Sequence, residues 1–384
     1  MTNETGARRI GLAGAGWVTP NHLKAWQRLH GRAAVVAIAD PNLDAARARA
    51  AEYGIQAVYP SVEAMLEREQ LDAIDVATPR ETHAPMCRLA AGRGLAILCQ
   101  KPLAPTFADA ASLVADVGSR ARLMVHENWR FRPHYRRIAA WLRDGRLGEI
   151  RTVTMSLFTS GLIPDASGSA PAIERQPMFA TLERLLVMEV LIHHVDTLRF
   201  LLGPLTLAGA SMGRSCPLVR GEDRASMFMT TEAGAAVSLL GDFMAHGYPV
   251  AQRDRLEILG TAGAILFEND HLRLVRGAIS RLTIGGPPNP GVGHGLTGSP
   301  AHAGVRWPAQ HQSPYPERHA ATTEDIEIEE DVVIDLAANY EASYLAVLTH
   351  FLDRLDDGGA FETSPEDNLE TLRLVEQVYD STFL

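Results

Sequence analysis

The chain has 384 residues, of which 46% are hydrophobic and 21% are charged, and its formal net charge is −10. The hydrophobic fraction excludes wholesale disorder, and no apolar run approaches the ~18 residues that a membrane-spanning helix needs. The acidic balance disfavours nucleic-acid partners, while Cys87, Cys99 and Cys216 are too few and too far apart for a disulfide framework or a Cys-rich zinc site. With a polar amino terminus that lacks a signal core, these features predict a reduced, cytoplasmic protein.

In the first third of the chain, short apolar runs alternate with amphipathic stretches. The runs that predict buried strands are 10–13, 33–39, 73–77, 96–99 and 123–125. The stretches with helical spacing are 21–29, 43–53, 61–67, 82–91 and 107–117. Such alternation is typical of an α/β Rossmann domain with a parallel, doubly wound sheet, which we place at residues 1–126.

After residue 126 the pattern changes. Helices are predicted at 133–143, 179–202, 340–355 and 368–379. Alternating segments that predict strands are 150–159, 207–212, 225–230, 235–243, 256–259, 264–268 and 272–276. Their close spacing predicts that residues 127–384 form an α+β domain with a large, mostly antiparallel open sheet, covered by helices on one face.

Two segments have an unusual composition. Residues 285–319 are rich in Gly, Pro and His, without periodicity, and are too long for an ordinary connection, so they form either a functional or a mobile loop. The irregular spacing of their histidines does not indicate a metal site. Residues 322–335 hold seven acids and no base, which indicates a solvated edge or loop face.

A glycine-rich loop follows the first predicted strand and opens the next helix. Gly11, Gly14 and Gly16 have the spacing G-x-x-G-x-G, and Ala15 and Trp17 lie within and after it. Glycines there let the backbone come close to a pyrophosphate, and the helix amino terminus offers free N–H groups to it. A tight strand–helix turn needs glycine in any case, so the loop alone leaves both interpretations open.

Asp40 ends the second predicted strand, where a dinucleotide-binding fold places a carboxylate on the ribose hydroxyls. A turn or helix-capping role before Pro41 is the alternative. Taken with the glycine loop, Asp40 predicts a dinucleotide cofactor. An acid at this position repels a 2′-phosphate, so we expect NAD in preference to NADP.

Four segments in this order, 11–16 with His22, 72–83, 98–104 and 189–196, resemble the glucose–fructose oxidoreductase / inositol dehydrogenase / rhizopine catabolism (Gfo/Idh/MocA) family of NAD(P)-dependent oxidoreductases. The resemblance implies an enzyme that acts on the CH–OH groups of sugars, cyclitols or polyols. It also implies a homo-oligomer, a dimer or a tetramer, whose open sheet forms the subunit interface. Segments 125–132 and 176–184 are similar to the apiose dehydrogenase-like members.

Lys101 follows a predicted strand at the edge where open α/β sheets bind ligands, and the resemblance implies that it is catalytic. A surface lysine is the alternative. Gln100 stands where the family commonly has Glu, which removes a carboxylate that would favour a charged lysine. Thr78 and Pro79 are expected to line the cofactor groove with His83 nearby, although all three also suit a helix entry.

Glu189 and His193 are spaced i, i+4 on a predicted helix and therefore share one face. The resemblance implies that His193 takes the hydroxyl proton, while Glu189, where the family usually has Asp, orients the imidazole or binds a substrate hydroxyl. A surface Glu–His contact is one alternative. Metal binding with His194 and Asp196 is another, and we expect no metal because adjacent histidines point about 100° apart on a helix.

Three further residues are candidates for binding substrate. Trp129 offers a flat face for a sugar, and Arg130 can bind hydroxyl or carboxylate oxygens. Arg184 is the weaker candidate, because a solvated helix arginine explains it as well. For Trp129, a place at a domain interface is the alternative.

The sequence thus predicts an NAD-dependent dehydrogenase of a sugar or polyol. Two alternative functions remain possible from the sequence. One is an enzyme with tightly held NAD that oxidises a sugar transiently in order to cleave a glycoside or to form a 3-oxo-sugar. The other is a catalytically silent sensor of NAD or sugar.

Overall fold

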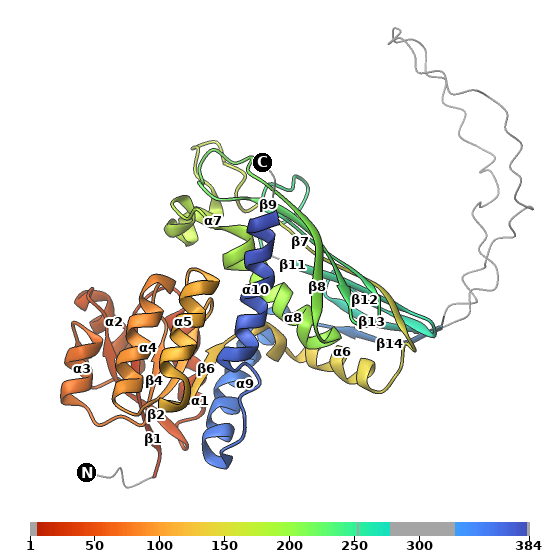
Figure 1. Ribbon diagram of the computed structural model, residues 1–384. Coiled ribbons are helices and arrows are strands. Elements are labelled where there is room, and N and C mark those ends of the chain that lie inside the picture. The colour runs from red at the N-terminus through yellow and green to blue at the C-terminus, as the bar shows by residue number, and fades with distance from the viewer. Residues whose placement is uncertain (1–5, 252, 277–326, 382–384) are drawn as a thin grey trace, which may run out of the picture.

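The computed structural model describes residues 6–251, 253–276 and 327–381. The loop predicted at 285–319 and the first part of the acidic segment 322–335 lie outside the described residues. Two sheets make up the framework, and Figure 1 shows them side by side with the carboxy-terminal helices between them. No helix among the described residues is long and apolar enough to cross a membrane.

The first sheet is parallel and has six strands in the order β3-β2-β1-β4-β5-β6. The strands are β1 (Arg8–Ala13), β2 (Ala33–Ala39), β3 (Ala57–Tyr59), β4 (Ala73–Val76), β5 (Ala96–Gln100) and β6 (Leu123–His126). All five predicted strands agree with observed ones within two residues at both ends, and the short β3 was missed because three residues carry no readable alternation. The prediction of a parallel, doubly wound sheet is confirmed.

Helices cover both faces of this sheet. They are α1 (Thr19–Arg28), α2 (Leu43–Tyr53), α3 (Val62–Arg68), α4 (His83–Gly92) and α5 (Phe107–Val117). Side chains cap three of them at the amino terminus: Asn42 accepts from Ala45, Ser61 from Ala64, and Thr106 from Asp109. These caps explain why the helix starts were readable from the sequence.

The second sheet has eight strands in the order β14-β13-β12-β11-β7-β10-β9-β8, all antiparallel neighbours except β7 and β10. The strands are β7 (Ile150–Phe158), β8 (Leu205–Gly213), β9 (Arg224–Thr231), β10 (Ala236–Asp242), β11 (Arg253–Gly260), β12 (Gly263–Glu268), β13 (His271–Arg276) and β14 (Glu327–Val333). The acidic segment was interpreted as an edge or loop face, and its described part supplies the edge strand β14.

The remaining helices pack on the inner face of the second sheet and against the first domain (Figure 1). They are α6 (Pro133–Arg143), α7 (Pro171–Arg175), α8 (Ile192–Leu202), α9 (Leu336–Asp357) and α10 (Pro365–Ser381), with short 3-10 turns η1 (Arg80–Thr82), η2 (Gly118–Arg120), η3 (Trp129–Phe131) and η4 (Pro177–Ala180).

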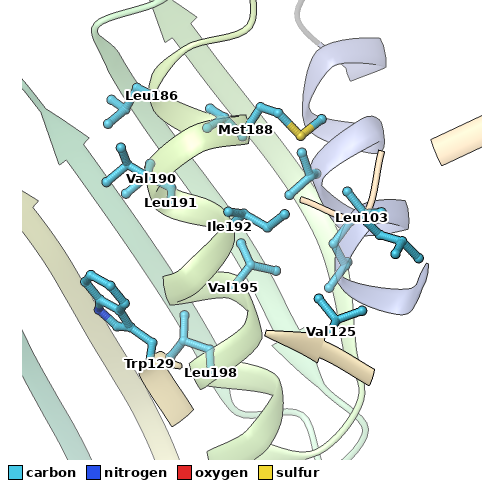
Figure 2. Packing of buried hydrophobic residues seen from close by; sticks show 14 of the residues in the cluster. Leu103, Val125, Trp129, Leu186, Met188, Val190, Leu191, Ile192, Val195 and Leu198 are labelled. Carbon is cyan, nitrogen blue, oxygen red and sulfur yellow. The ribbon is translucent and has the colours of Figure 1, made fainter. Parts of the chain in front are cut away.

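The continuous helix predicted at 179–202 is wrong. A turn at Pro177–Ala180 is followed by an irregular stretch, then by a π-helix at Leu186–Leu191 (η5) and only then by α8. The π-helix and α8 form the centre of the largest apolar cluster. Figure 2 shows Leu186, Leu191 and Val195 within it, with Leu103 and Val125 of the first domain nearby.

Candidate active site

A cavity of about 780 Å³ opens at the carboxyl edge of the parallel sheet, where it faces the second sheet. The loops after β1, β4, β5 and β6 meet there, as ligand sites of open α/β sheets do. The lining residues singled out by the sequence are Gly16, Trp17, Thr78, Pro79, Gln100, Lys101, Trp129, Glu189 and His193. The volume lies within the ordinary range of cavities that bind small molecules.

The glycine loop is shaped by its backbone. Gly14 has φ +102°, and a Cβ there would lie 2.4 Å from the carbonyl oxygen of Ala77, so only glycine fits. A Cβ on Gly16 would meet no atom within 4 Å, which leaves open space in front of the loop. The loop therefore provides a cradle next to the amino terminus of α1, of the kind that binds a dinucleotide pyrophosphate.

Asp40 follows β2 and points back to this loop. Its Oδ2 accepts from the backbone N–H of Ala15 at 2.8 Å, and its Oδ1 accepts from that of Asn42 at 2.7 Å. The carboxylate thus fixes the loop and is half-buried at the position expected for a ribose contact. The two roles are compatible, because each carboxylate oxygen can accept a further hydrogen bond.

Gly11 and His83 are predicted cofactor residues that pack inside the protein and do not line the cavity. Gly11 lies inside β1, where a Cβ would come within 2.5 Å of Leu71, so it serves packing. His83 is buried, and its ring nitrogens each lie 2.8 Å from a carbonyl oxygen, of Pro102 and of Thr78. Burial lowers the pKa of His83. Both predictions are corrected: Gly11 packs within the sheet, and His83 connects the loops after β4 and β5.

Lys101 and Glu189 meet at the cavity wall. The Lys101 ammonium donates to the backbone oxygen of Glu189 at 2.7 Å and lies 3.6 Å from its carboxylate. Arg80, which the sequence analysis missed, donates to the same carboxylate at 2.5 Å. The prediction that Glu189 orients the imidazole of His193 is corrected, because its carboxylate binds Arg80 and Lys101 instead.

The π-helix that carries Glu189 is fixed by hydrogen bonds to Glu222, a residue from another part of the chain. The carboxylate of Glu222, on the approach to β9, accepts from the backbone N–H groups of Leu185 at 3.2 Å and Val187 at 2.9 Å. It also accepts from the hydroxyl of Tyr379 at 2.6 Å. Glu222 therefore anchors the start of the π-helix and joins it to α10.

His193 lies at the start of α8 with its ring in a defined orientation. Its Nδ1 is 2.6 Å from Oε1 and 2.8 Å from Oε2 of Glu127, a fully buried residue after β6. The ring stacks on the indole of Trp129 with centroids 4.0 Å apart and planes 16° apart. Among the described residues, none forms a hydrogen bond with Nε2, the ring nitrogen that remains for a ligand.

Side chains of the protein cover both faces of the Trp129 indole. His193 stacks on it, and the guanidinium of Arg132 lies 3.5 Å from its ring centroid. Two groups this close to one centroid must lie on opposite faces. The expected stacking of a sugar on Trp129 is therefore corrected. Its Nε1 donates to Asp254 at 3.1 Å.

Asp254 of β11 joins several of these side chains. Its carboxylate accepts from Tyr135 at 2.7 Å and from Trp129, and it lies 2.8 Å from Nε2 of His194. Burial alone would raise the pKa of Asp254, but His194 and Arg132 lower it well below its usual range. Asp254 is thus a permanent anion at the cavity wall, and nothing in the sequence near it marked it.

Arg130 and Arg184 do not line the cavity. Arg130 is buried, where it binds both oxygens of Asp196 at 2.7 and 2.6 Å and also Asp367 at 2.7 Å. Arg184 binds both oxygens of Glu376 at 2.9 and 2.7 Å. Both predictions of substrate binding are corrected to ion pairs that join α8 and the π-helix region to α10.

The His193–Asp196 segment is not arranged as a metal site. The structure turns its members to different partners: His194 to Asp254, Asp196 to Arg130. Within residues 6–251, 253–276 and 327–381, no group of three or more His, Cys, Asp or Glu side chains has the arrangement of a metal site.

Comparisons with known proteins agree with this geometry. Residues 8–127 match the family model described as "Oxidoreductase family, NAD-binding Rossmann fold", and residues 135–266 match the "GFO/IDH/MocA C-terminal domain". The chain is 30% identical over 370 residues to a D-apiose dehydrogenase of Paraburkholderia graminis, across 96% of this chain and 86% of that protein.

Two further relatives are similar over much of their length. An inositol 2-dehydrogenase of Rhizobium meliloti is 31% identical over 270 residues, which covers 68% of this chain and 76% of that protein. The crystal structure of an oxidoreductase from Agrobacterium radiobacter in complex with NAD⁺, L-tartaric acid and magnesium has a TM-score of 0.77 and 24% identity, and covers 97% of this chain and 96% of that one. The latter similarity shows the shared fold.

Proposed function

Since the chain belongs to the GFO/IDH/MocA family of NAD-binding oxidoreductases, we propose that it transfers a hydride between a CH–OH carbon of a sugar or polyol and nicotinamide. One observation carries the proposal: Lys101 and His193 line the same cavity at the carboxyl edge of the parallel sheet. The relatives named for D-apiose and inositol support the substrate class.

The residues at this edge fit the cofactor. Gly14, Ala15 and Gly16 would hold the pyrophosphate in the open space before α1, with Trp17, Thr78 and Pro79 along the cavity wall. Asp40 would accept from the ribose hydroxyls and repel a 2′-phosphate, which favours NAD. When bound, NAD supplies the nicotinamide ring that accepts or returns the hydride.

The protein's own groups act on the substrate oxygen. Lys101 has donors left beyond its bond to the Glu189 carbonyl, and these can bind and polarise that oxygen. His193 offers Nε2 as a general base for the hydroxyl proton. Glu189, braced by Arg80, keeps the ammonium in place through charge attraction.

We further propose that the chain divides functionally at about residue 126, and that it works in the cytoplasm as a homodimer or homotetramer without nucleic-acid or membrane partners. Three buried free cysteines, Cys87, Cys99 and Cys216, suit a reducing compartment. Exposed apolar side chains on the outer face of the second sheet support association through that face.

The test uses a panel of sugars and polyols with NAD, followed by NADH absorbance, and the variant Lys101→Met. Methionine keeps the length of the side chain but removes its charge, so kcat on the best substrate is expected to fall about 100-fold or more while NAD affinity is retained. Lys24 on α1 is exposed and is the only other lysine of the chain, so Lys24→Met is a matched control. An unchanged kcat in Lys101→Met would remove the assigned role.

A further inference from the structure

Glu127 carries an ionisable carboxyl group at a position that is completely shielded from solvent. It follows β6, has 0% exposure, and therefore lost its hydration entirely on folding. Its Oε1 accepts from the backbone N–H of Trp129 at 2.9 Å, and both of its oxygens lie within 2.8 Å of Nδ1 of His193. A buried carboxylate is costly unless such partners compensate it, and here the second partner is the proposed base.

Two side chains hold the ring of His193 in its orientation. Trp129 stacks on one face of the imidazole, and the carboxylate of Glu127 lies 2.6 Å from Nδ1. Nδ1 therefore points to Glu127 and Nε2 towards the cavity. The carboxylate is the group that determines which of the two nitrogens carries the proton.

We propose that Glu127 is the positioning residue of the general base: its ionised carboxylate keeps the proton of His193 on Nδ1 and leaves the lone pair of Nε2 for the substrate hydroxyl. The proposal rests on the proposed function, because it takes His193 as the base.

The protonation states balance as follows. The O–H bond of the substrate breaks and an N–H bond forms at Nε2, while the C–H bond breaks and its hydride would pass to the nicotinamide of bound NAD. The resulting imidazolium is neutralised by the Glu127 carboxylate. A protonated Glu127 would instead donate to Nδ1. The imidazole would then carry its proton on Nε2 and could not accept another there.

This reversal gives the reaction a pH dependence. Burial raises the pKa of Glu127 to about 7, against the opposing effect of its bond to Trp129. Burial, with Lys101, lowers the pKa of His193 well below its usual range. The other titratable or charged groups that face the pair are His126, Arg130, Arg132, His194, Asp196, Asp254 and Tyr344. Activity is therefore expected to fall with decreasing pH as Glu127 gains a proton near neutrality.

The first experiment compares kcat and KM of Glu127→Gln, Glu127→Asp and the wild type across pH. The amide cannot be ionised, so kcat is expected to fall about 100-fold or more, while KM for the substrate changes less than about threefold. The decrease of kcat at acidic pH (the acidic limb of the pH profile) should disappear in this variant. Aspartate restores the charge at a shorter reach, so it should regain part of kcat together with an acidic limb.

Two controls separate the possible outcomes. Asp223→Asn removes another fully buried carboxylate, one that accepts from the backbone N–H groups of Ser215 and Cys216, and it should lower stability without changing the pH profile. His193→Asn should abolish turnover. An active His193→Asn overturns the proposed function, whereas an inactive His193→Asn beside a fully active Glu127→Gln overturns only the role of Glu127.

A second readout is independent of turnover. In cofactor-free protein labelled with ¹⁵N-histidine, the His193 signals, identified by their loss in His193→Asn, should show a protonated Nδ1 and an unprotonated Nε2 above neutral pH. Glu127→Gln should change that distribution. An Nε2-protonated ring in the wild type would contradict the proposal. If the Gln variant does not fold, the wild-type spectrum and the pH profile of Glu127→Asp still decide.

Discussion

The amide of Gln100 lies between two buried histidines. Its Nε2 is 2.8 Å from Nε2 of His22 and 3.3 Å from Nδ1 of His126, and its Oε1 accepts from the backbone N–H of Lys101 at 3.0 Å. An amide nitrogen only donates, so both histidine nitrogens must present lone pairs. The proton of His22 is then on Nδ1, 2.9 Å from the carboxylate of Asp75.

Gln100→Glu would replace this donor with a carboxylate that faces two lone pairs. The variant can repair the contact only if a histidine takes up a proton, which raises the folded-state pKa of that histidine above its unfolded value. The repair is then present at low pH and lost as pH rises. We expect the free energy of unfolding to be lower than that of the wild type by about 2–4 kcal/mol at about pH 8, and by clearly less at about pH 6.

Denaturant unfolding at the two pH values measures this difference. Gln27→Glu, on an exposed position of α1, is the control and should show little loss at either pH. A loss in Gln100→Glu that is the same at both pH values would show that no histidine takes up the proton.

The predicted site residues that line the cavity lie in short contiguous motifs. Lys101 and Gln100 follow a strand whose apolar pattern was plain, and His193 lies in a segment that resembles a family motif. Glu127 and Asp254 were missed because they act through partners far away in the chain: His193 lies 66 positions after Glu127, and Asp254 lies 60 positions after His194. Pairings of this kind have no local signal.

At the scale of elements, the π-helix Leu186–Leu191 is the clearest departure from expectation. Its apolar residues have helical periodicity, and periodicity does not distinguish a π-helix from an α-helix. The wider turn is stabilised by Glu222, which lies more than 30 residues later and accepts from the backbone amides at the start of the π-helix. Wider turns of this type are common at functional sites, and this one carries Glu189.

Glu222→Gln tests whether this anchor positions the site. The Glu222 carboxylate has two accepting oxygens for the backbone N–H groups and the Tyr379 hydroxyl, whereas an amide has only one. We therefore expect a loss of about 1–3 kcal/mol in the free energy of unfolding. The loosened π-helix should also displace Glu189 from Lys101, which lowers kcat about 10-fold. Unfolding and steady-state kinetics measure the two effects.

The control for Glu222→Gln is again Asp223→Asn, whose carboxylate holds backbone amides away from the cavity. It should lose comparable stability and keep its kcat. Equal kcat in both variants would mean that the π-helix keeps its form without the anchor, and that Glu222 contributes only to stability.

At the scale of the whole molecule, the outer face of the second sheet carries exposed apolar side chains. Phe228 on β9 is 53% exposed, Leu259 on β11 is 41% exposed, and Ile328 and Val333 on the edge strand β14 are 53% and 69% exposed. Their neighbours in the strands alternate between buried and exposed, as expected for a sheet with one covered face. Such residues are typical of an association surface.

Charges introduced on this face test the proposed homo-oligomer. We expect Phe228→Glu combined with Leu259→Glu to shift the protein towards monomers in analytical ultracentrifugation, because each glutamate would meet apolar surface in the assembled state. The conservative Phe228→Leu combined with Leu259→Met is the matched control and should keep the assembly. A wild-type protein that is monomeric at micromolar concentration would contradict the proposed oligomer.

The presence of two different sheets could be predicted from the sequence. Strands that alternate with helices predict the first sheet, and closely spaced strands predict the second. Both patterns are local and are repeated many times along the chain. The relative placement of the two sheets could not be predicted, because contacts between residues far apart in the chain leave no local pattern in the sequence. Arg32 binds Asp353 and Asp356, both at 2.7 Å, and Arg8 binds Asp356 at 2.7 Å. These partners are more than 300 residues apart.

The helices α9 and α10 cross from the second sheet to the first domain and are packed between the two (Figure 1). Thr363, in the turn that joins them, exchanges two hydrogen bonds with Val125 of β6, at 2.9 and 2.7 Å. The turn between the two helices is therefore bound to strand β6 of the parallel sheet. Any movement of this turn away from the parallel sheet would have to break both hydrogen bonds, so the carboxy-terminal helices and β6 are expected to move together.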